Sequence, residues 1–122
     1  MLCLYRYSIL YFKRRKFLPR EQFQTLSEPM YYVLLALVDE CCGADVMNKV
    51  AELSGGRVIV GPGTVYAMLD KFLKSGVICM TVREGRKKTY LISDYGKRLL
   101  KEEYARVQLL SFDGKSILEG LK

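Results

Sequence analysis

The sequence predicts a mainly helical α+β fold that contains one β-hairpin. Residues 61–76 have the pattern of an amphipathic helix that opens with a Gly-Pro pair and closes at a glycine. Two runs of strand-forming residues, 77–82 and 89–92, then flank a short basic segment, which is typical of a hairpin. Apolar residues at helical spacing before and after these elements predict the remaining helices.

The composition favours a nucleic-acid-binding protein over an enzyme. The 122 residues suffice for one domain with a modest core, and the formal net charge is +7. Residues 57–98 alone carry nine basic and three acidic side chains. Such a basic segment is the electrostatic signature of nucleic-acid binding, and a merely solvated basic surface is the alternative. Because the chain has no histidine, no Ser-His-Asp or Cys-His arrangement can form, and we expect no enzyme.

The cysteine pattern argues against a metal site or a disulfide framework. Cys41 and Cys42 are adjacent, and neither they nor Cys3 and Cys79 have the CxxC spacing of a zinc site. We therefore expect no metal, no cofactor, and free thiols in a reducing cytoplasm. A redox-sensing role for the adjacent pair is a less favoured alternative, because reactivity requires exposure and a lowered pKa.

Residues 1–24 are expected to form an N-terminal extension or arm. An apolar, aromatic run that contains Arg6 precedes four consecutive basic residues at 13–16. The run is too short to span a membrane, and its charges follow the apolar part, unlike those of a secretory signal. We therefore expect no stable membrane insertion, and a segment lying on a membrane surface is the alternative.

Two helices are expected at the start of a domain that covers residues 25–93. Thr25 or Ser27 can cap the first helix, and Glu28 in its first turn favours the helix dipole. A break at Cys42-Gly43 separates it from the second helix, which runs from about residue 44 to residue 53. The predicted buried side chains are Tyr31, Leu34, Leu35, Leu37 and Val38 in the first helix, and Val46, Met47, Val50 and Leu53 in the second.

The connector between the second helix and the helix at 61–76 is longer than the turn of a minimal helix-turn-helix. Its segment Arg57-Val58-Ile59-Val60 is rich in strand formers. We therefore expect a small strand between the helices, as in winged variants of the motif.

The helix at 61–76 has one apolar face and one face that is small, polar or basic. The apolar face consists of Val65, Met68, Leu69, Phe72 and Leu73. The second face consists of Gly63, Thr64, Ala67, Lys71 and Lys74, with Tyr66 at its boundary. Such a face suits a groove lined with phosphate, so our hypothesis is a DNA recognition helix. For Tyr66, a place at the rim of the core is an equally good interpretation.

The segment between the two predicted strands, residues 83–88, contains four cations and one anion. A charged loop tip is usually only solvated, but this one follows directly on a helix with a cationic face. Both can therefore lie along one phosphate backbone. Two strands with a basic tip after such a helix make a wing, whose cations are Arg83, Arg86, Lys87 and Lys88.

The last segment, residues 94–122, is expected to be a dimerisation helix and a tail. Ser93-Asp94 is an N-cap signal, and a broad apolar stripe extends to Leu110. Part of this stripe has no obvious partner in the chain, so pairing with a second copy would cover it; folding back on the chain's own core is the alternative. We expect residues 112–114 to interrupt the helix before a short final one. The expected dimer contacts are Leu99, Leu100, Tyr104, Val107 and Leu110.

An ordered set of motifs over about residues 28–110 resembles the PadR-type transcriptional regulators. The matching segments are Leu53-Ser54-Gly55-Gly56-Arg57-Val58, Pro62-Gly63-Thr64-Val65-Tyr66 with Leu69, Gly76-Val77-Ile78, Gly85-Arg86-Lys87-Lys88-Thr89-Tyr90 and Ser93-Asp94-Tyr95-Gly96. The resemblance implies a winged helix-turn-helix domain, a homodimer formed through the C-terminal helix, and repression at a pseudo-palindromic operator. It also implies release from DNA by a small aromatic or drug-like effector. The short tail resembles the compact subfamily.

The resemblance also assigns roles to residues and shows two departures. The residues that match the family's recognition helix and wing are Thr64, Tyr66 and Lys71, and Arg86, Lys87 and Lys88, respectively. In this chain Gly43-Ala44 stands where the family usually has Gly-Tyr. The chain also has no tryptophan, which in the family's short form helps line an effector cavity.

The predicted mechanism places two recognition helices of a dimer in successive major grooves, about one helical turn apart. Lys71 and the wing cations would bind phosphate, which makes the affinity salt-dependent. Thr64 and Tyr66 can donate hydroxyl hydrogen bonds, while Gly63 and Ala67 allow close approach to the bases. The alternative function is a winged-helix protein–protein interaction module without DNA binding.

Overall fold

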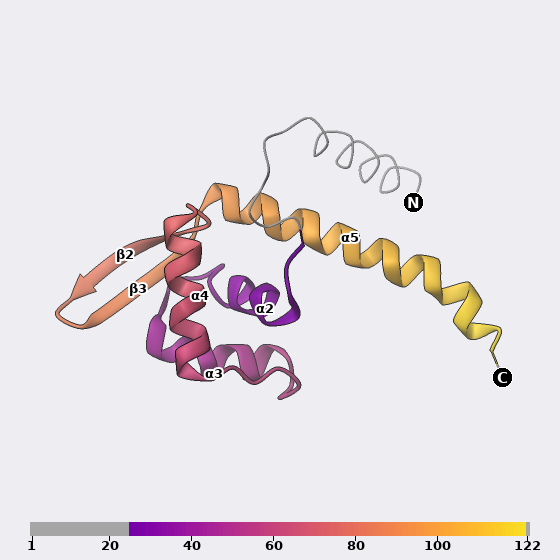
Figure 1. The fold of residues 1–122 in the computed structure, drawn as a ribbon, viewed down its shortest axis with the longest axis horizontal. Helices are drawn as coiled ribbons and strands as arrows, with labels where there is room; N and C mark the ends of the chain where they lie inside the picture. Colours follow the sequence, from indigo (N-terminus) through magenta and orange to yellow (C-terminus); the bar gives the residue numbers. More distant parts are fainter. Residues whose placement is uncertain (1–24, 122) are drawn as a thin grey trace. The chain divides into compact units, whose positions relative to one another are not determined.

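The computed structural model describes residues 25–121; the arm predicted for residues 1–24 lies outside them. In chain order the elements are α2 (Glu28–Ala36), β1 (Cys41–Cys42), α3 (Gly43–Leu53), α4 (Pro62–Lys74), β2 (Ile78–Glu84), β3 (Lys87–Ile92) and α5 (Asp94–Glu119) (Figure 1). Helices thus accompany one small antiparallel sheet, which confirms the predicted mainly helical α+β class. Residues 25–100 form one compact unit, and residues 101–121 belong to a second.

The core of the first unit lies among α2, α3, α4 and the sheet. α2 packs on α3, α3 packs on α4, and α4 contacts β2 (Figure 1). Each element contributes apolar side chains, whose removal from water is the main driving force for folding. The largest fully buried side chains are Phe72, Leu34, Leu37, Leu69, Ile78, Val33, Val46, Val50, Val65 and Val77.

α2 begins where the sequence predicts it, but its buried face differs from the prediction. The Ser27 hydroxyl oxygen accepts a hydrogen bond from the Met30 N–H (3.3 Å), as an N-cap does. Val38 was predicted to be buried and is 45% exposed, because the helix already ends at Ala36. The side chains that face the core are Val33, Leu34, Ala36 and Leu37, while Tyr31 and Leu35 are half-buried.

α3 buries Val46 and Val50 as predicted, while its last residue contradicts the prediction. Leu53 is 49% exposed because the chain turns away immediately after it, through Gly55 and Gly56 at φ 61° and 82°. Ser54 turns inward instead. Its buried hydroxyl oxygen accepts a hydrogen bond from the Val58 N–H (3.0 Å), which closes the turn.

The third strand of the sheet is β1 and not the strand predicted between α3 and α4. Residues 57–60 form a connector without regular secondary structure; Val58 and Val60 are buried, and Ile59 is 75% exposed. β1 pairs antiparallel with β3 instead, with Cys41 opposite Tyr90, so the strand order is β1-β3-β2. The β-branched residues of the connector thus indicate burial in the core and not pairing in the sheet.

The predicted hairpin is present, and its turn is tighter than expected. β2 and β3 pair antiparallel from Ile78 opposite Ile92 to Glu84 opposite Lys87, with an irregularity between Met80 and Val82. The turn therefore consists of two residues, and the first of them, Gly85, has a positive φ of 57° that glycine accommodates. The expected six-residue loop was wrong, and several of its cations lie on the strands.

α5 begins at the predicted cap and continues through the predicted break. The Ser93 hydroxyl oxygen accepts a hydrogen bond from the Gly96 N–H (3.1 Å). The helix runs unbroken from Asp94 to Glu119, although an interruption was expected at residues 112–114. An interior glycine costs a helix only about 1 kcal/mol, which the flanking turns tolerate.

Across residues 25–121, no helix combines the length and apolar character that crossing a membrane requires.

Candidate nucleic-acid interface

α4 is held in place by its apolar face. Gly61 is the N-cap and Pro62 the first helical residue, and Gly76 follows the helix at a positive φ of 76°. Val65 and Phe72 have no exposed surface, and Leu69 has almost none. The helix therefore cannot rotate without losing core contacts, which fixes the side chains that it presents to solvent.

The opposite side of α4 is exposed. The residues predicted for DNA contact on this helix are all exposed: Gly63, Thr64, Tyr66, Ala67, Lys71 and Lys74. Lys74 forms an ion pair with Asp70 (Nζ–Oδ2 2.9 Å) one turn before it. Because both groups are well exposed, water screens this pair and Lys74 stays able to exchange partners. Asp70 reduces the positive charge of this face, and the prediction did not include it.

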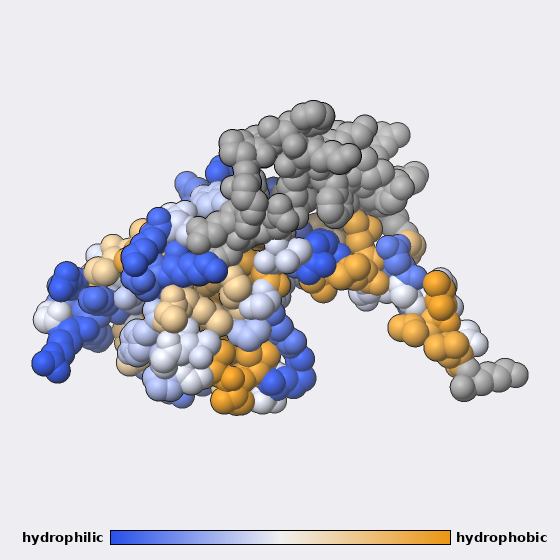
Figure 2. Space-filling view, in the orientation of Figure 1, coloured by the Kyte–Doolittle hydropathy of each residue, from blue (hydrophilic) through white to orange (hydrophobic). Residues whose placement is uncertain are grey.

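The hairpin carries the strongest concentration of positive charge next to α4. Arg83, Arg86 and Lys87 are exposed and Lys88 is half-buried. Within residues 25–121 none of these four side chains has an ion-pair partner within 4.0 Å. Figure 2 shows the end of the hairpin as one of the most hydrophilic parts of the visible face. The charge is therefore available to an external anion.

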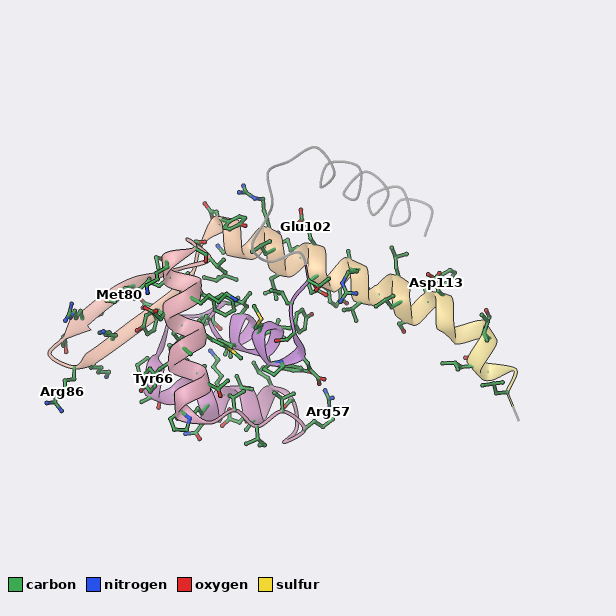
Figure 3. All side chains as sticks on the ribbon, in the orientation of Figure 1. Arg57, Tyr66, Met80, Arg86, Glu102 and Asp113 are labelled. Carbon is green, nitrogen blue, oxygen red and sulfur yellow. The ribbon has the colours of Figure 1, made fainter. Side chains whose placement is uncertain are left out.

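A pocket connects the hairpin, α4 and the start of α3. It has a volume of about 260 Å³. Its lining residues are Cys42, Gly43, Ala44, Tyr66, Arg86, Lys87, Lys88 and Tyr90. Tyr66 projects from α4, and Arg86 lies at the hairpin end, as the labels in Figure 3 show. Tyr66 of the helix and the wing, which lie apart in the sequence, thus share one cavity.

Gly43 forms the floor between two aromatic rings. A Cβ at this position would lie 3.2 Å from Tyr66 Cε1 and 3.5 Å from Tyr90 Cε2. The lack of a side chain therefore lets both rings approach the start of α3. Local sequence does not indicate Gly43 or Tyr90 as site residues, because only the pairing of β1 with β3 brings them together.

Burial raises the pKa of the Tyr90 hydroxyl above its ordinary value, and Tyr66 and Asp70 raise it further. At neutral pH this hydroxyl therefore carries its proton and can donate a hydrogen bond. The neighbouring Cys42 thiol donates to Asp45 Oδ2 (3.1 Å) and makes no side-chain cap to α3. Within the described residues, no cluster of three or more histidine, cysteine, aspartate and glutamate side chains could hold a metal.

The predicted dimer residues divide into two groups along α5. Leu99 and Leu100 are buried in the single chain. Tyr104, Val107 and Leu110 are 54%, 45% and 56% exposed. The apolar exposure continues towards the end of the helix at Phe112, Ile117 and Leu118 and beyond its end at Leu121, and Figure 2 shows hydrophobic surface over this part of α5.

Comparison with known proteins gives one family. The model of the transcriptional regulator PadR-like family matches residues 33–102, which is more than half of the chain. The matched segment contains the end of α2, all of α3 and α4, the sheet and the start of α5. No match was found among curated proteins.

Several solved structures share the fold. A PadR family transcriptional regulator from Eggerthella lenta DSM 2243 is 20% identical, with a TM-score of 0.64 over 93% of this chain and 92% of its own. A PadR-like regulator from Bacillus cereus ATCC 14579 is 22% identical, with a TM-score of 0.63 over 75% and 92%. BpsR from Bordetella bronchiseptica, whose DNA binding is regulated by 6-hydroxynicotinic acid, is 19% identical, with a TM-score of 0.57 over 98% and 76%.

Proposed function

The chain belongs to the PadR-like family of DNA-binding transcriptional regulators, and on this premise we propose that it represses transcription as a homodimer on a pseudo-palindromic operator. It is a regulator and not an enzyme. The three thiols of the described residues, Cys41, Cys42 and Cys79, are free, which supports a location in the reducing cytoplasm.

The observation that carries the proposed DNA contact is the shared cavity of α4 and the hairpin. Tyr66 of α4 and Arg86, Lys87 and Lys88 of the hairpin line the same pocket. A recognition helix and a wing that meet at one surface can follow one DNA backbone from the major groove outward. The absence of ion-pair partners for the hairpin cations within the described residues supports the same assignment.

The residues of the interface divide into two roles. The cations Lys71, Lys74, Arg83, Arg86, Lys87 and Lys88 contact phosphates and fix the register of the protein on the duplex. The hydroxyls of Thr64 and Tyr66 donate further hydrogen bonds. Gly63 and Ala67 allow the backbone of α4 to come close to the base edges, and the Ala67 methyl group can contact a thymine methyl. Few side chains read bases, so DNA shape contributes to specificity.

The proposed dimer rests on the exposed face of α5. Val107, Leu110 and Ile117 recur at intervals of three and seven residues, and each is at least 45% exposed. This spacing places them on one side of a helix, as in a coiled-coil seam. A second copy of the same helix is the partner that this repeating pattern fits, and a twofold dimer matches a pseudo-palindromic operator.

We also propose that a small aromatic compound releases the protein from DNA. The support is the structural likeness to BpsR, whose DNA binding 6-hydroxynicotinic acid regulates. The measurement is operator binding in the presence of a panel of small aromatic acids. Compounds that weaken binding identify the effector class, and a panel without effect contradicts this part of the proposal.

The experiment that tests the whole proposal selects fragments of the source genome with the purified full-length protein. We expect enriched fragments to share an inverted repeat whose half-sites lie about one helical turn apart. In a reporter that carries such a fragment, the protein should lower transcription. A selection without enrichment at low salt would contradict DNA binding and favour the protein–protein interaction module.

A further inference from the structure

The pocket at Gly43 contains donors that nothing in the described part of the chain satisfies. α3 begins there, and its N-cap residue Cys42 makes no side-chain hydrogen bond to the first turn. The Cys42 thiol instead donates to the Asp45 carboxylate (3.1 Å). The first N–H groups of a helix have no partners within the helix, and together with the helix dipole they attract anions. Gly43 and Ala44 are small, so the helix start remains accessible from the pocket.

Tyr90 supplies a second, independent observation that points to a ligand site. The residue is 6% exposed and lines the pocket. Within residues 25–121 its hydroxyl makes no hydrogen bond. A buried hydroxyl without a partner is unfavourable and rare, so such a group requires an explanation. An acceptor bound in the pocket provides one.

The charges around the pocket select the ligand class. Arg86, Lys87 and Lys88 line one side. The acidic groups nearby are Asp45, which accepts from the Cys42 thiol, and Asp70, which forms an ion pair with Lys74. Three cations without ion-pair partners among residues 25–121 thus line the pocket, and neither carboxylate belongs to its lining. The balance favours an anion.

We propose that this pocket is a binding site for one phosphate group, held by the N–H groups at the start of α3, the Tyr90 hydroxyl and the cations of the hairpin. The proposal deepens the DNA-binding function proposed above and rests on it for its main source of phosphate. A phosphate has several acceptor oxygens that point in different directions, which suits donors arriving from a helix start, a strand and a hairpin end. The source is the DNA backbone or a free phosphate-containing molecule.

The first arm of the test uses inorganic phosphate. The ¹⁵N-labelled full-length protein is titrated with phosphate and, at equal ionic strength, with chloride. We expect saturable shifts of the Gly43, Ala44 and Lys87 amide signals with phosphate alone. Tyr90→Phe keeps the ring in the core and removes the hydroxyl, so it should weaken phosphate binding about tenfold, as expected for a hydrogen bond to a charged group. The matched control is Tyr32→Phe, whose hydroxyl bonds Arg57 outside the pocket.

The second arm uses duplex DNA and separates the two sources. Tyr90→Phe should weaken duplex binding about tenfold without changing its salt dependence, because no charge is removed. If Tyr90→Phe weakens duplex binding but free phosphate does not saturate the pocket of the wild-type protein, the ligand is the DNA backbone. If free phosphate saturates the pocket of the wild-type protein and Tyr90→Phe leaves duplex binding unchanged, the ligand is a free phosphate.

If Tyr90→Phe behaves like Tyr32→Phe in both arms, the pocket proposal is overturned. If the wild-type protein binds no duplex at all, the DNA-binding proposal is wrong, and the phosphate titration still decides whether the pocket binds an anion. The two proposals can therefore fail separately.

Discussion

The α-carbon of Gly96 lies directly against the carbonyl oxygen of Val77. A Cβ at position 96 would lie 2.2 Å from that oxygen and 2.6 Å from Ile92 Cγ1. The Ser93 hydroxyl donates to the same Val77 carbonyl (2.9 Å) and accepts from the Gly96 N–H. The missing side chain thus determines how closely the start of α5 approaches the residue that precedes β2.

We expect Gly96→Ala to destabilise the fold by about 2–3 kcal/mol, because the added methyl group meets backbone that cannot move independently. The control is Gly114→Ala on the same helix, where a Cβ would meet only Leu118 Cδ1 at 3.6 Å. That variant should gain up to about 1 kcal/mol from helix propensity. Urea denaturation of both variants gives the comparison. Equal effects of the two substitutions would contradict the close approach at Val77.

Arg57 connects the linker before α4 to α2 through two contacts of unequal strength. Its guanidinium donates to the Tyr32 hydroxyl (2.7 Å) and to Glu28 Oε1 (3.3 Å). The ion pair is more than half exposed, so it contributes about 0.5 kcal/mol or less. We expect a coupling of about 1 kcal/mol between Arg57→Ala and Tyr32→Phe in a double-mutant cycle, and almost none between Arg57→Ala and Glu28→Gln at physiological salt. A larger coupling free energy with Glu28→Gln than with Tyr32→Phe would show that the ion pair dominates.

Cys41 gives the stability a dependence on alkaline pH. Burial raises the pKa of its thiol above 9.0; Lys49 lowers this pKa in part, and Cys42 and Asp45 raise it. Well below pH 9.0 the thiol is neutral in both the folded and the unfolded chain, so its contribution to stability is fully present. Above 9.0 the unfolded chain ionises first, so the free energy of unfolding falls as the pH rises through the folded pKa.

We therefore expect Cys41→Ala to lose less stability than the wild type between about pH 8 and about pH 10, near the ordinary range of a thiol pKa. The measurement is urea denaturation at several pH values. Cys79→Ala is the control, because Cys79 is exposed. A steeper alkaline decline in Cys41→Ala would reverse the sign of the effect and contradict it.

The elements that the sequence predicted well are those with local signals at their ends. Gly61, Pro62 and Gly76 fix the limits of α4, and Ser93 fixes the start of α5. Caps and left-handed glycines act through neighbouring residues, so the sequence alone contains the information. The continuity of α5 was missed because the local penalty at Gly114 was weighed without the helix on both sides of it.

The parts that were missed depend on contacts between distant residues. β1 has only two residues, and its pairing with β3 joins positions about 50 apart in the chain. Through that pairing Gly43 meets Tyr90, and without it neither residue indicates a site. The DNA-contact residues on α4 and the hairpin were predictable as exposed cations and small side chains. Their contact with DNA stays a prediction.

The hairpin cations should control the salt dependence of duplex binding. Lys87 is exposed and has no ion-pair partner within the described residues. Lys87→Ala should therefore weaken binding to all duplexes similarly and reduce the slope of log affinity against log salt by about one. Lys101→Ala on α5 removes an equal charge far along the chain and should leave the slope unchanged. Equal slopes in all three proteins would remove Lys87 from the interface.

The exposed face of α5 allows a test of the proposed dimer, in which one negative charge is introduced on this face and, as a control, on the opposite face. Leu110 is 56% exposed and lies seven residues before Ile117 and three after Val107, on the face with heptad spacing. A carboxylate there would be desolvated in a helix pair. Leu110→Glu should therefore dissociate the dimer, whereas its effect on the stability of a single chain should be small.

Ser116 is the matched position, because it is exposed and nine residues after Val107, which places it half a turn away on the opposite face. Ser116→Glu adds the same charge and should leave the assembly intact. Sedimentation equilibrium at micromolar concentration distinguishes the single chain of 14.0 kDa from an assembly of twice that mass. A wild-type protein that sediments as the single chain, or a Leu110→Glu variant that sediments as a dimer, would exclude this face as the interface. Loss of operator binding in Leu110→Glu but not in Ser116→Glu would connect dimerisation to DNA recognition, since a monomer contacts only one half-site.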